Sequence, residues 1–393
     1  MNREHRKDVL TLAAIAIAGS LLIVSLVAKG PHVVHDPLTA VPSNAFIVVN
    51  IDVRSLASSP LGAALAGEKG AHAGAFFGVD SIEGTCGFDP LPHVEGIAIS
   101  VPEGDTHGEL GIAVTGDIPK GSLVQCAKAL IEKRGGTWSM RESSSYSVVS
   151  ENNEHGAEIA FREGGPVLVG RGEWLERMID TVEGRSKSMA VPNDDLHHAL
   201  RADVATSDPE AKALVASAVL PRDLRDRIGA ELVEAPDGGE APGNAAMQGV
   251  LGVSGVSLAV RAGKAHEETR VVGELRCDGD PTAADIACKK VETLILHERL
   301  KLSGDVRVRL SGLGPLVDGL QTQVAGGALT LKTSAPSDTL ARVLTRMLDA
   351  PHAKGGPKGS EPGRGAAPAP GAPPTPGTPA PPAPSPQAKG SGR

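Results

Sequence analysis

Two stretches, DIPKGSLVQCAKALIEK at residues 117–133 and GDPTAADIACKKVETLI at residues 279–295, determine how the chain is organised. Each places a proline seven positions before a cysteine, and the two stretches lie 162 residues apart. The same offset relates the glycine pair Gly164-Gly165 to the pair Gly326-Gly327. Coincidences at one fixed offset predict an internal duplication.

The sequence around these stretches predicts the same order of strands and helices in each copy. GIAISVPEG at 96–104 and GVSLAVRAG at 255–263 alternate apolar and small residues, as strands do. Apolar residues at helical spacing follow in both quoted stretches, each with a proline in the expected first turn. Further strands are expected in EIAFREGGPVLVGRG at 158–172, VRVRLSG at 306–312 and GGALTLKTS at 326–334, and short helices over 174–182 and 337–348.

This order predicts an α+β protein, because an antiparallel sheet buries such a pattern by packing helices on one face. We expect a single N-terminal transmembrane helix, two related units of antiparallel sheet with helices on one face, and a disordered Pro-rich tail. The predicted boundaries are 1–8 for a cytoplasmic n-region, 9–28 for the transmembrane helix, 29–41 for a linker, 42–184 for the first α+β unit with an extra N-terminal strand and helix, 185–252 for a helical and Gly/Pro-rich connector, 253–349 for the second α+β unit, and 350–393 for the disordered Pro/Ala/Gly-rich tail.

The location follows from VLTLAAIAIAGSLLIVSLVA at residues 9–28, an uncharged run of 20 residues. As a helix it spans about 30 Å, the thickness of a hydrocarbon core. Arg3, Arg6 and Lys7 precede it, and the positive-inside rule then places the N-terminus in the cytoplasm. We therefore predict an inner-membrane protein with a single pass and a periplasmic body. A cleaved signal peptide is the alternative, and it also exports the body.

The four cysteines are interpreted in this light. An exported chain faces oxidising surroundings, and an even count allows complete pairing in three connectivities. The duplication favours Cys86–Cys126 and Cys277–Cys288, since each pair lies within one unit. Metal binding and catalytic thiols are the alternatives, but the sequence has no CxxC spacing.

A resemblance supports the compartment. VPSNAFIVVNIDVRSLASSPLGAAL at 41–65, followed by CGFDPLPHVEGIAISVP at 86–102, resembles uncharacterised exported or membrane-anchored bacterial envelope proteins. No activity is established for those proteins, so the resemblance implies a compartment and no chemistry.

Composition and motifs argue against several activities. A formal net charge of −8 opposes binding to phosphate backbones, and an aromatic content of 2% leaves few stacking surfaces, so we expect no nucleic-acid partner. PNDDLHHAL at 192–200 offers Asp194, Asp195, His197 and His198 as a metal cluster, but we favour the interpretation that Asn193 or Asp194 caps a helix and that the histidines face water. We nominate no catalytic, cofactor-binding or metal-binding residue and no cofactor.

The predicted function is that of a non-enzymatic, membrane-anchored envelope protein acting as a scaffold or binding module. Its expected partners are the membrane, through residues 9–28, and an envelope protein or the cell wall, which the tail is long enough to reach. The alternative is an exported enzyme or small-ligand carrier with a site at the junction of the two units. The sequence leaves the oligomeric state open.

Overall fold

The computed structural model describes residues 36–66, 82–89, 91–103, 110–153, 156–190, 196–233, 249 and 251–349. The elements of the first half are η1 (Pro37–Ala40), β1 (Ala45–Asp52), α2 (Val53–Ala57), α3 (Pro60–Ala66), α5 (Ile82–Cys86), η3 (Leu91–His93), β2 (Val94–Pro102), β3 (Gly111–Gly116), α6 (Lys120–Lys133), β4 (Trp138–Ser143), β5 (Tyr146–Glu151), β6 (Glu158–Phe161), β7 (Val167–Gly170) and α7 (Gly172–Val182). Those of the second half are α8 (Leu196–Ser207), β8 (Leu214–Val219), α9 (Arg222–Val233), β9 (Val253–Arg261), β10 (Glu268–Cys277), α11 (Pro281–Gly304), α12 (Val306–Ser311), α13 (Gly314–Asp318), β11 (Gln321–Ala325), β12 (Ala328–Pro336) and α14 (Ser337–Asp349).

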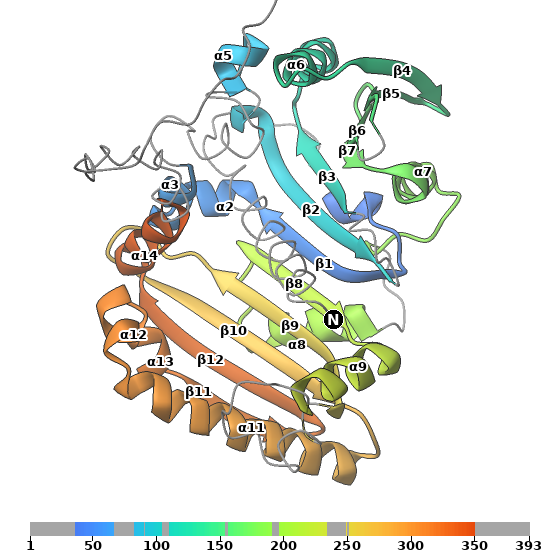
Figure 1. The fold of residues 1–393 in the computed structure, drawn as a ribbon. Helices are drawn as coiled ribbons and strands as arrows, with labels where there is room; N and C mark the ends of the chain where they lie inside the picture. The colour runs from blue at the N-terminus through green and yellow to red at the C-terminus, as the bar shows by residue number, and fades with distance from the viewer. Residues whose placement is uncertain are drawn as a thin grey trace, which may run out of the picture. The chain divides into compact units, whose positions relative to one another are not determined.

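The strands form one 12-stranded antiparallel sheet in the order β11-β12-β10-β9-β8-β1-β2-β3-β7-β6-β5-β4 (Figure 1). The prediction of two units, each with its own sheet, is therefore wrong. The two halves share one sheet because β1 and β8 pair along five residues, from Ile47↔Ala218 to Ile51↔Leu214.

Strand β8 corrects the prediction that the connector is helical. LVASAV at 214–219 stands in the middle of it and hydrogen-bonds to β1 on one side and β9 on the other. Its alternation is weak because Ala and Ser replace large apolar residues, so the decisive stabilisation comes from the two neighbouring strands.

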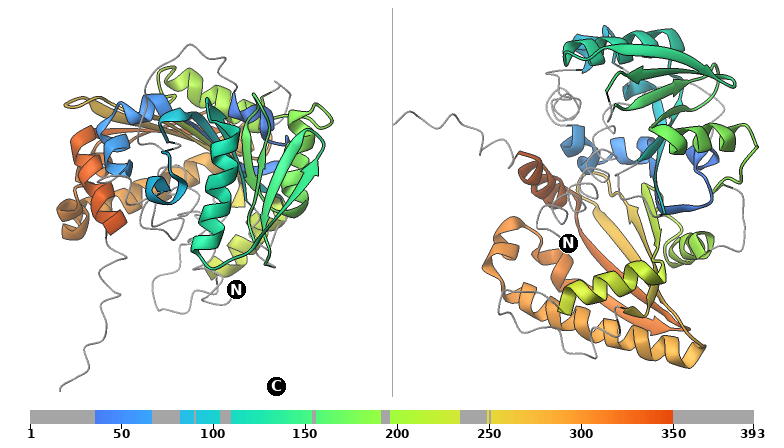
Figure 2. Two further views of the ribbon diagram at one scale, coloured as in Figure 1. Left: turned by 90° about the horizontal axis from the view of Figure 1, so that it is seen from above. Right: turned by 45° about the vertical axis from the view of Figure 1, so that its right-hand side comes forward.

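Helices cover both faces of the sheet, which corrects the prediction of one covered face (Figure 2). Adjacent residues of β9 show this. Gly255 faces α8, since a Cβ there would lie 2.6 Å from Leu200 Cδ1. Val256 points the other way and joins the cluster that contains Cys288 and Val291 of α11. In the first half, α7 and α6 likewise contribute to separate apolar clusters.

The segment VRVRLSG is a helix, α12, and not the predicted strand. The Asp305 side chain caps it by accepting a hydrogen bond from Arg307 N at 2.7 Å, and Gly312 ends it with φ of 90°. These two local signals outweigh the alternation of Val and Arg.

The hairpin of β4 and β5 was not predicted. Ser144, at φ of 53°, makes the turn between them, and β5 then continues the sheet to β6. In β4, buried and exposed side chains do not alternate, since Met140, Arg141 and Glu142 are all exposed. This fits an edge strand, which has only one neighbouring strand.

The predicted transmembrane helix at 9–28 and the predicted tail at 350–393 lie outside the described residues. No helix within the described ranges is long and apolar enough to cross a membrane. The transmembrane part of the predicted fold class and the inner-membrane localisation that depended on it are corrected to this extent: the described ranges contain no spanning helix.

Strands follow one another in a similar order on the two sides of the β1–β8 pair. Outward on one side run β1, β2, β3, β7 and β6, and on the other β8, β9, β10, β12 and β11. In both halves one helix, α6 or α11, follows the third of these strands in the chain. The duplication and the domain boundaries stay predictions.

Candidate functional site

Large apolar side chains are exposed where α11 meets α12. The exposed fractions are 72% for Leu300, 42% for Leu302, 65% for Val306 and 74% for Leu310. Val306 and Leu310 stand four residues apart on α12, so they share one face of the helix. We name Leu300, Lys301, Leu302, Val306, Arg307 and Leu310 the α12 surface.

The backbone under the α12 surface is held by hydrogen bonds. Asp305 joins the two helices: its backbone N–H donates to Leu302 O at 3.1 Å, and its carboxylate caps α12. The guanidinium of Arg299 donates to Val317 O at 3.0 Å and Asp318 O at 2.6 Å, which ties α11 to α13. Figures 1 and 2 show α12 and α13 beside the C-terminal end of α11. The apolar side chains therefore project from a fixed support.

Cations are interleaved with these apolar residues. Residues 299–311, RLKLSGDVRVRLS, hold four Lys or Arg and one Asp, a net charge of +3 within a chain of −8. Lys301 pairs with Glu298 at 2.9 Å and Arg309 with Asp318 at 3.7 Å. All four side chains are about half exposed, and ion pairs of this kind add little stability. Another anion can therefore replace the carboxylate beside Lys301 or Arg309. The sequence did not indicate this surface, because VRVRLSG at 306–312 was predicted to be a strand and no exposed helix was expected there.

A buried polar row lies on the opposite side of the sheet, beneath α8. Ser217, Ser257 and Glu274 stand directly opposite one another on β8, β9 and β10, and their exposed fractions are 2, 2 and 4%. Within the described residues the Ser257 hydroxyl has no hydrogen-bond partner, and neither does Arg201 Nη1 on α8. Buried polar atoms without partners are rare and mark places where packing alone does not explain the residue choice.

His197 anchors α8 at one end of this row. Its ring is 3% exposed, with Nδ1 at 2.9 Å from Ser217 Oγ and Nε2 at 2.8 Å from Ala45 O. Because the carbonyl only accepts, Nε2–H donates to it and Nδ1 accepts from the serine hydroxyl in the neutral ring. The prediction that both histidines face water is therefore wrong for His197; His198 is exposed.

Glu274 lies further along the row. The pKa of Glu274 is raised to about 7. Burial is the largest cause, and the negative charge of Asp203 and a hydrogen bond to it act in the same direction, while the nearby Arg276 guanidinium partly opposes them. Asp203 also pairs with Arg276. Below about pH 7 this carboxyl pair therefore holds a proton between α8 and β10. The buried polar row therefore positions α8 on the sheet. We assign no reacting atom to the row.

An open pocket of about 510 Å³ lies between α7 and strands β4 and β6. Arg141 pairs there with Glu158 at 3.3 Å and with Glu176 at 2.6 Å, and Gly172 N donates to Glu158 at 3.2 Å. Burial lowers the pKa of Arg141, but the hydrogen bonds and charges of both glutamates outweigh it and raise the pKa. The charges of the pocket are used to hold α7 against the β4–β5 hairpin.

The junction of the two halves is packed on both sides. His197 covers β1 and β8 on one face, and Ile51, Leu214 and Ala216 belong to an apolar cluster on the other. The pocket at α7 lies away from this junction, where the alternative function had placed a ligand site.

The candidate metal cluster at 194–198 is only partly described by the structure. Asp194 and Asp195 lie outside the described residues, and His197 is engaged as described. In the part of the chain that the structure describes, no group of three His, Cys, Asp or Glu side chains is placed to hold a metal ion.

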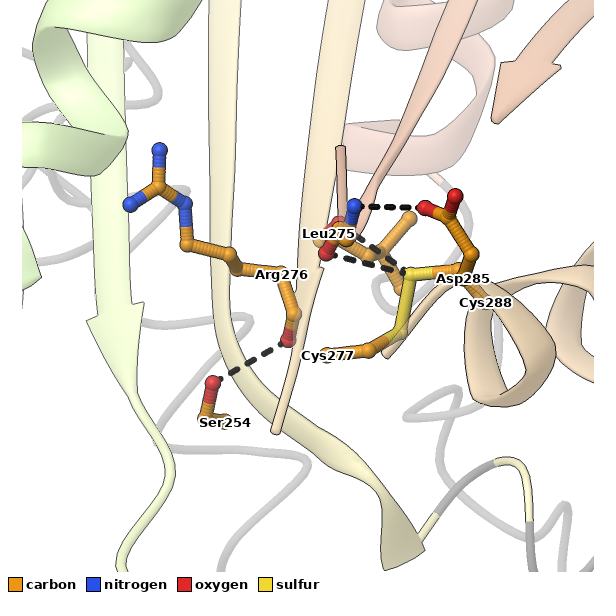
Figure 3. Close-up of a disulfide and its surroundings, with 7 residues drawn as sticks. Ser254, Leu275, Arg276, Cys277, Asp285 and Cys288 are labelled. Carbon is orange, nitrogen blue, oxygen red and sulfur yellow. Dashed lines mark hydrogen bonds between the residues drawn. A yellow bond between two sulfur atoms is a disulfide. The ribbon is translucent and has the colours of Figure 1, made fainter. Parts of the chain in front are cut away.

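Both predicted disulfides are confirmed. Cys86 at the end of α5 bonds to Cys126 of α6, and Cys277 at the end of β10 bonds to Cys288 of α11 (Figure 3). Beside the second bridge, the Asp285 carboxylate accepts a hydrogen bond from Gly327 N at 2.6 Å, so α11 is tied to the β11–β12 turn as well. Each bridge fixes one long helix to the rest of its half.

Known proteins show little similarity to this chain. No known protein family matches the sequence, and no curated protein does. A solved structure described as crystal form I of TP0453 is similar over 80% of this chain and 98% of its own, at 10% identity and a TM-score of 0.41. A likeness at this level transfers neither fold nor activity.

Proposed function

We propose that the protein is a non-enzymatic binding module of an oxidising compartment outside the cytoplasm, such as the cell envelope. It docks onto another component of that compartment through the α12 surface. The observation that carries this proposal is the exposure of Leu300, Val306 and Leu310 at 72, 65 and 74% on a hydrogen-bonded support. Clustered apolar side chains of this kind mark interaction sites in soluble proteins. The two disulfides suit an oxidising compartment.

Hydrogen–deuterium exchange of the full chain, alone and with fragments of cell envelope, tests the proposal. Amides of residues 300–311 are expected to exchange more slowly with the fragments, while amides of 281–295 in the same helix keep their rates. The double variant V306S/L310S should lose this protection. Unchanged exchange at 300–311, or equal protection of the double variant, would show that the surface does not dock.

A further inference from the structure

Building on that proposed function, we propose that the α12 surface docks onto a lipid bilayer that exposes anionic headgroups. The size of the surface favours lipid over a protein partner. A stable protein interface covers roughly 800 Å² on each side, and four aliphatic side chains fall well below that area. In a bilayer, each apolar side chain that enters the interface adds to binding by itself, without a matching groove.

The order of residues supports the same partner. Lys301 lies between Leu300 and Leu302, and Arg307 follows Val306 directly, so each exposed apolar side chain has a cation beside it. At a membrane surface the apolar groups enter the acyl boundary while Lys and Arg extend to the headgroup phosphates.

Charge contrast orients the molecule. Residues 299–311 carry +3, and the whole chain carries −8, which leaves −11 on the other 380 residues. An anionic bilayer repels most of the protein and attracts this segment. The pairs Lys301–Glu298 and Arg309–Asp318 are half exposed, so lipid phosphates replace the carboxylates at little cost.

The test measures amide exchange at residues 300–311 in the full chain with intact disulfides. Vesicles of phosphatidylcholine are compared with vesicles that also contain phosphatidylglycerol. The readout is local, so the apolar run at 9–28, which every variant shares, does not affect the comparison. We expect exchange at 300–311 to slow by about tenfold on the anionic vesicles, with less slowing at high salt.

Three variants make the test specific. V306S/L310S should return the exchange rates to within about twofold of the vesicle-free values, since two inserted side chains are lost. K301S/R307S should weaken protection and flatten its salt dependence. Ile286, which is 53% exposed on the same α11, supplies the matched control, and I286S should keep full protection.

The outcomes separate this inference from the proposed function. Absent protection on anionic vesicles overturns the lipid partner, as does loss of protection in I286S equal to that in V306S/L310S. If envelope fragments protect 300–311 but protease-treated fragments do not, the partner is a protein; docking then stands and the lipid inference falls. Protection that depends on protein concentration without vesicles points to a second copy and also overturns it.

Discussion

His197 Nδ1 lies 2.9 Å from the hydroxyl oxygen of Ser217, which joins α8 to strand β8 inside the protein. The other ring nitrogen reaches Ala45 O on β1 at 2.8 Å. One side chain thus links the helix to the two strands through which the halves of the sheet meet.

Replacing His197 with Ala should lower the free energy of unfolding by about 2–3 kcal/mol, because a buried ring is removed and two polar groups lose their partner. Urea unfolding followed by circular dichroism measures this. The exposed neighbour His198 is the matched control, and H198A should stay within about 0.5 kcal/mol of the wild type. Equal effects of the two variants would contradict the role assigned to His197.

Glu274 predicts a dependence of stability on pH. Its pKa is about 7 in the folded protein and 4.5 in the reference state, so the folded protein binds the proton more tightly. The stability gained from this proton is present below pH 4.5 and is lost as pH rises to about 7. A shift of that size corresponds to at most about 3 kcal/mol.

The variant E274Q should flatten this dependence and unfold at higher urea concentration than the wild type at pH 8, because the amide stays neutral. Glu268 is exposed on the same strand, and E268Q should keep the wild-type pH profile. If E274Q retains the wild-type slope between pH 4.5 and 7, another group titrates.

The disulfides should contribute unequally to stability. The bridged cysteines are 40 residues apart in Cys86–Cys126 and 11 apart in Cys277–Cys288. Loop-closure entropy then predicts losses of about 4 and about 3 kcal/mol when each pair is changed to Ala. Urea unfolding of the two double variants gives the values. Thiols that react with an alkylating reagent in the unreduced, unfolded protein would show that the bridges do not form.

Two glycines should respond to Ala in opposite directions. A Cβ on Gly111 would lie 2.5 Å from both Met178 Sδ and Trp174 Nε1, so G111A should cost about 1–3 kcal/mol through overpacking. Nothing lies within 4 Å of a Cβ on Gly121 in α6, and G121A should add about 0.5 kcal/mol through helix propensity. Thermal unfolding of both variants decides, and destabilisation by G121A would count against the α6 assignment.

Local patterns could be predicted where a segment carries its own signals. The strands at 96–104 and 255–263 and the helices that begin near Pro119 and Pro281 were found from alternation, helical spacing and proline position, and the structure has them at β2, β9, α6 and α11. The cysteine pairs followed from the repeat and are confirmed. Strand β8 was missed, since LVASAV becomes a strand only between β1 and β9.

The sequence by itself determined which segments form many of the strands and helices of each half, and it favoured the cysteine pairing that the structure confirms, because these patterns depend on spacing along the chain. The tertiary structure alone decided that the halves share one sheet, that His197 is buried, and that Val306 and Leu310 are left in water. Burial depends on what packs across from a residue, and that partner is distant in sequence. A helix with the pattern of α12 is covered or exposed according to its neighbours, so the candidate site emerged only from the fold.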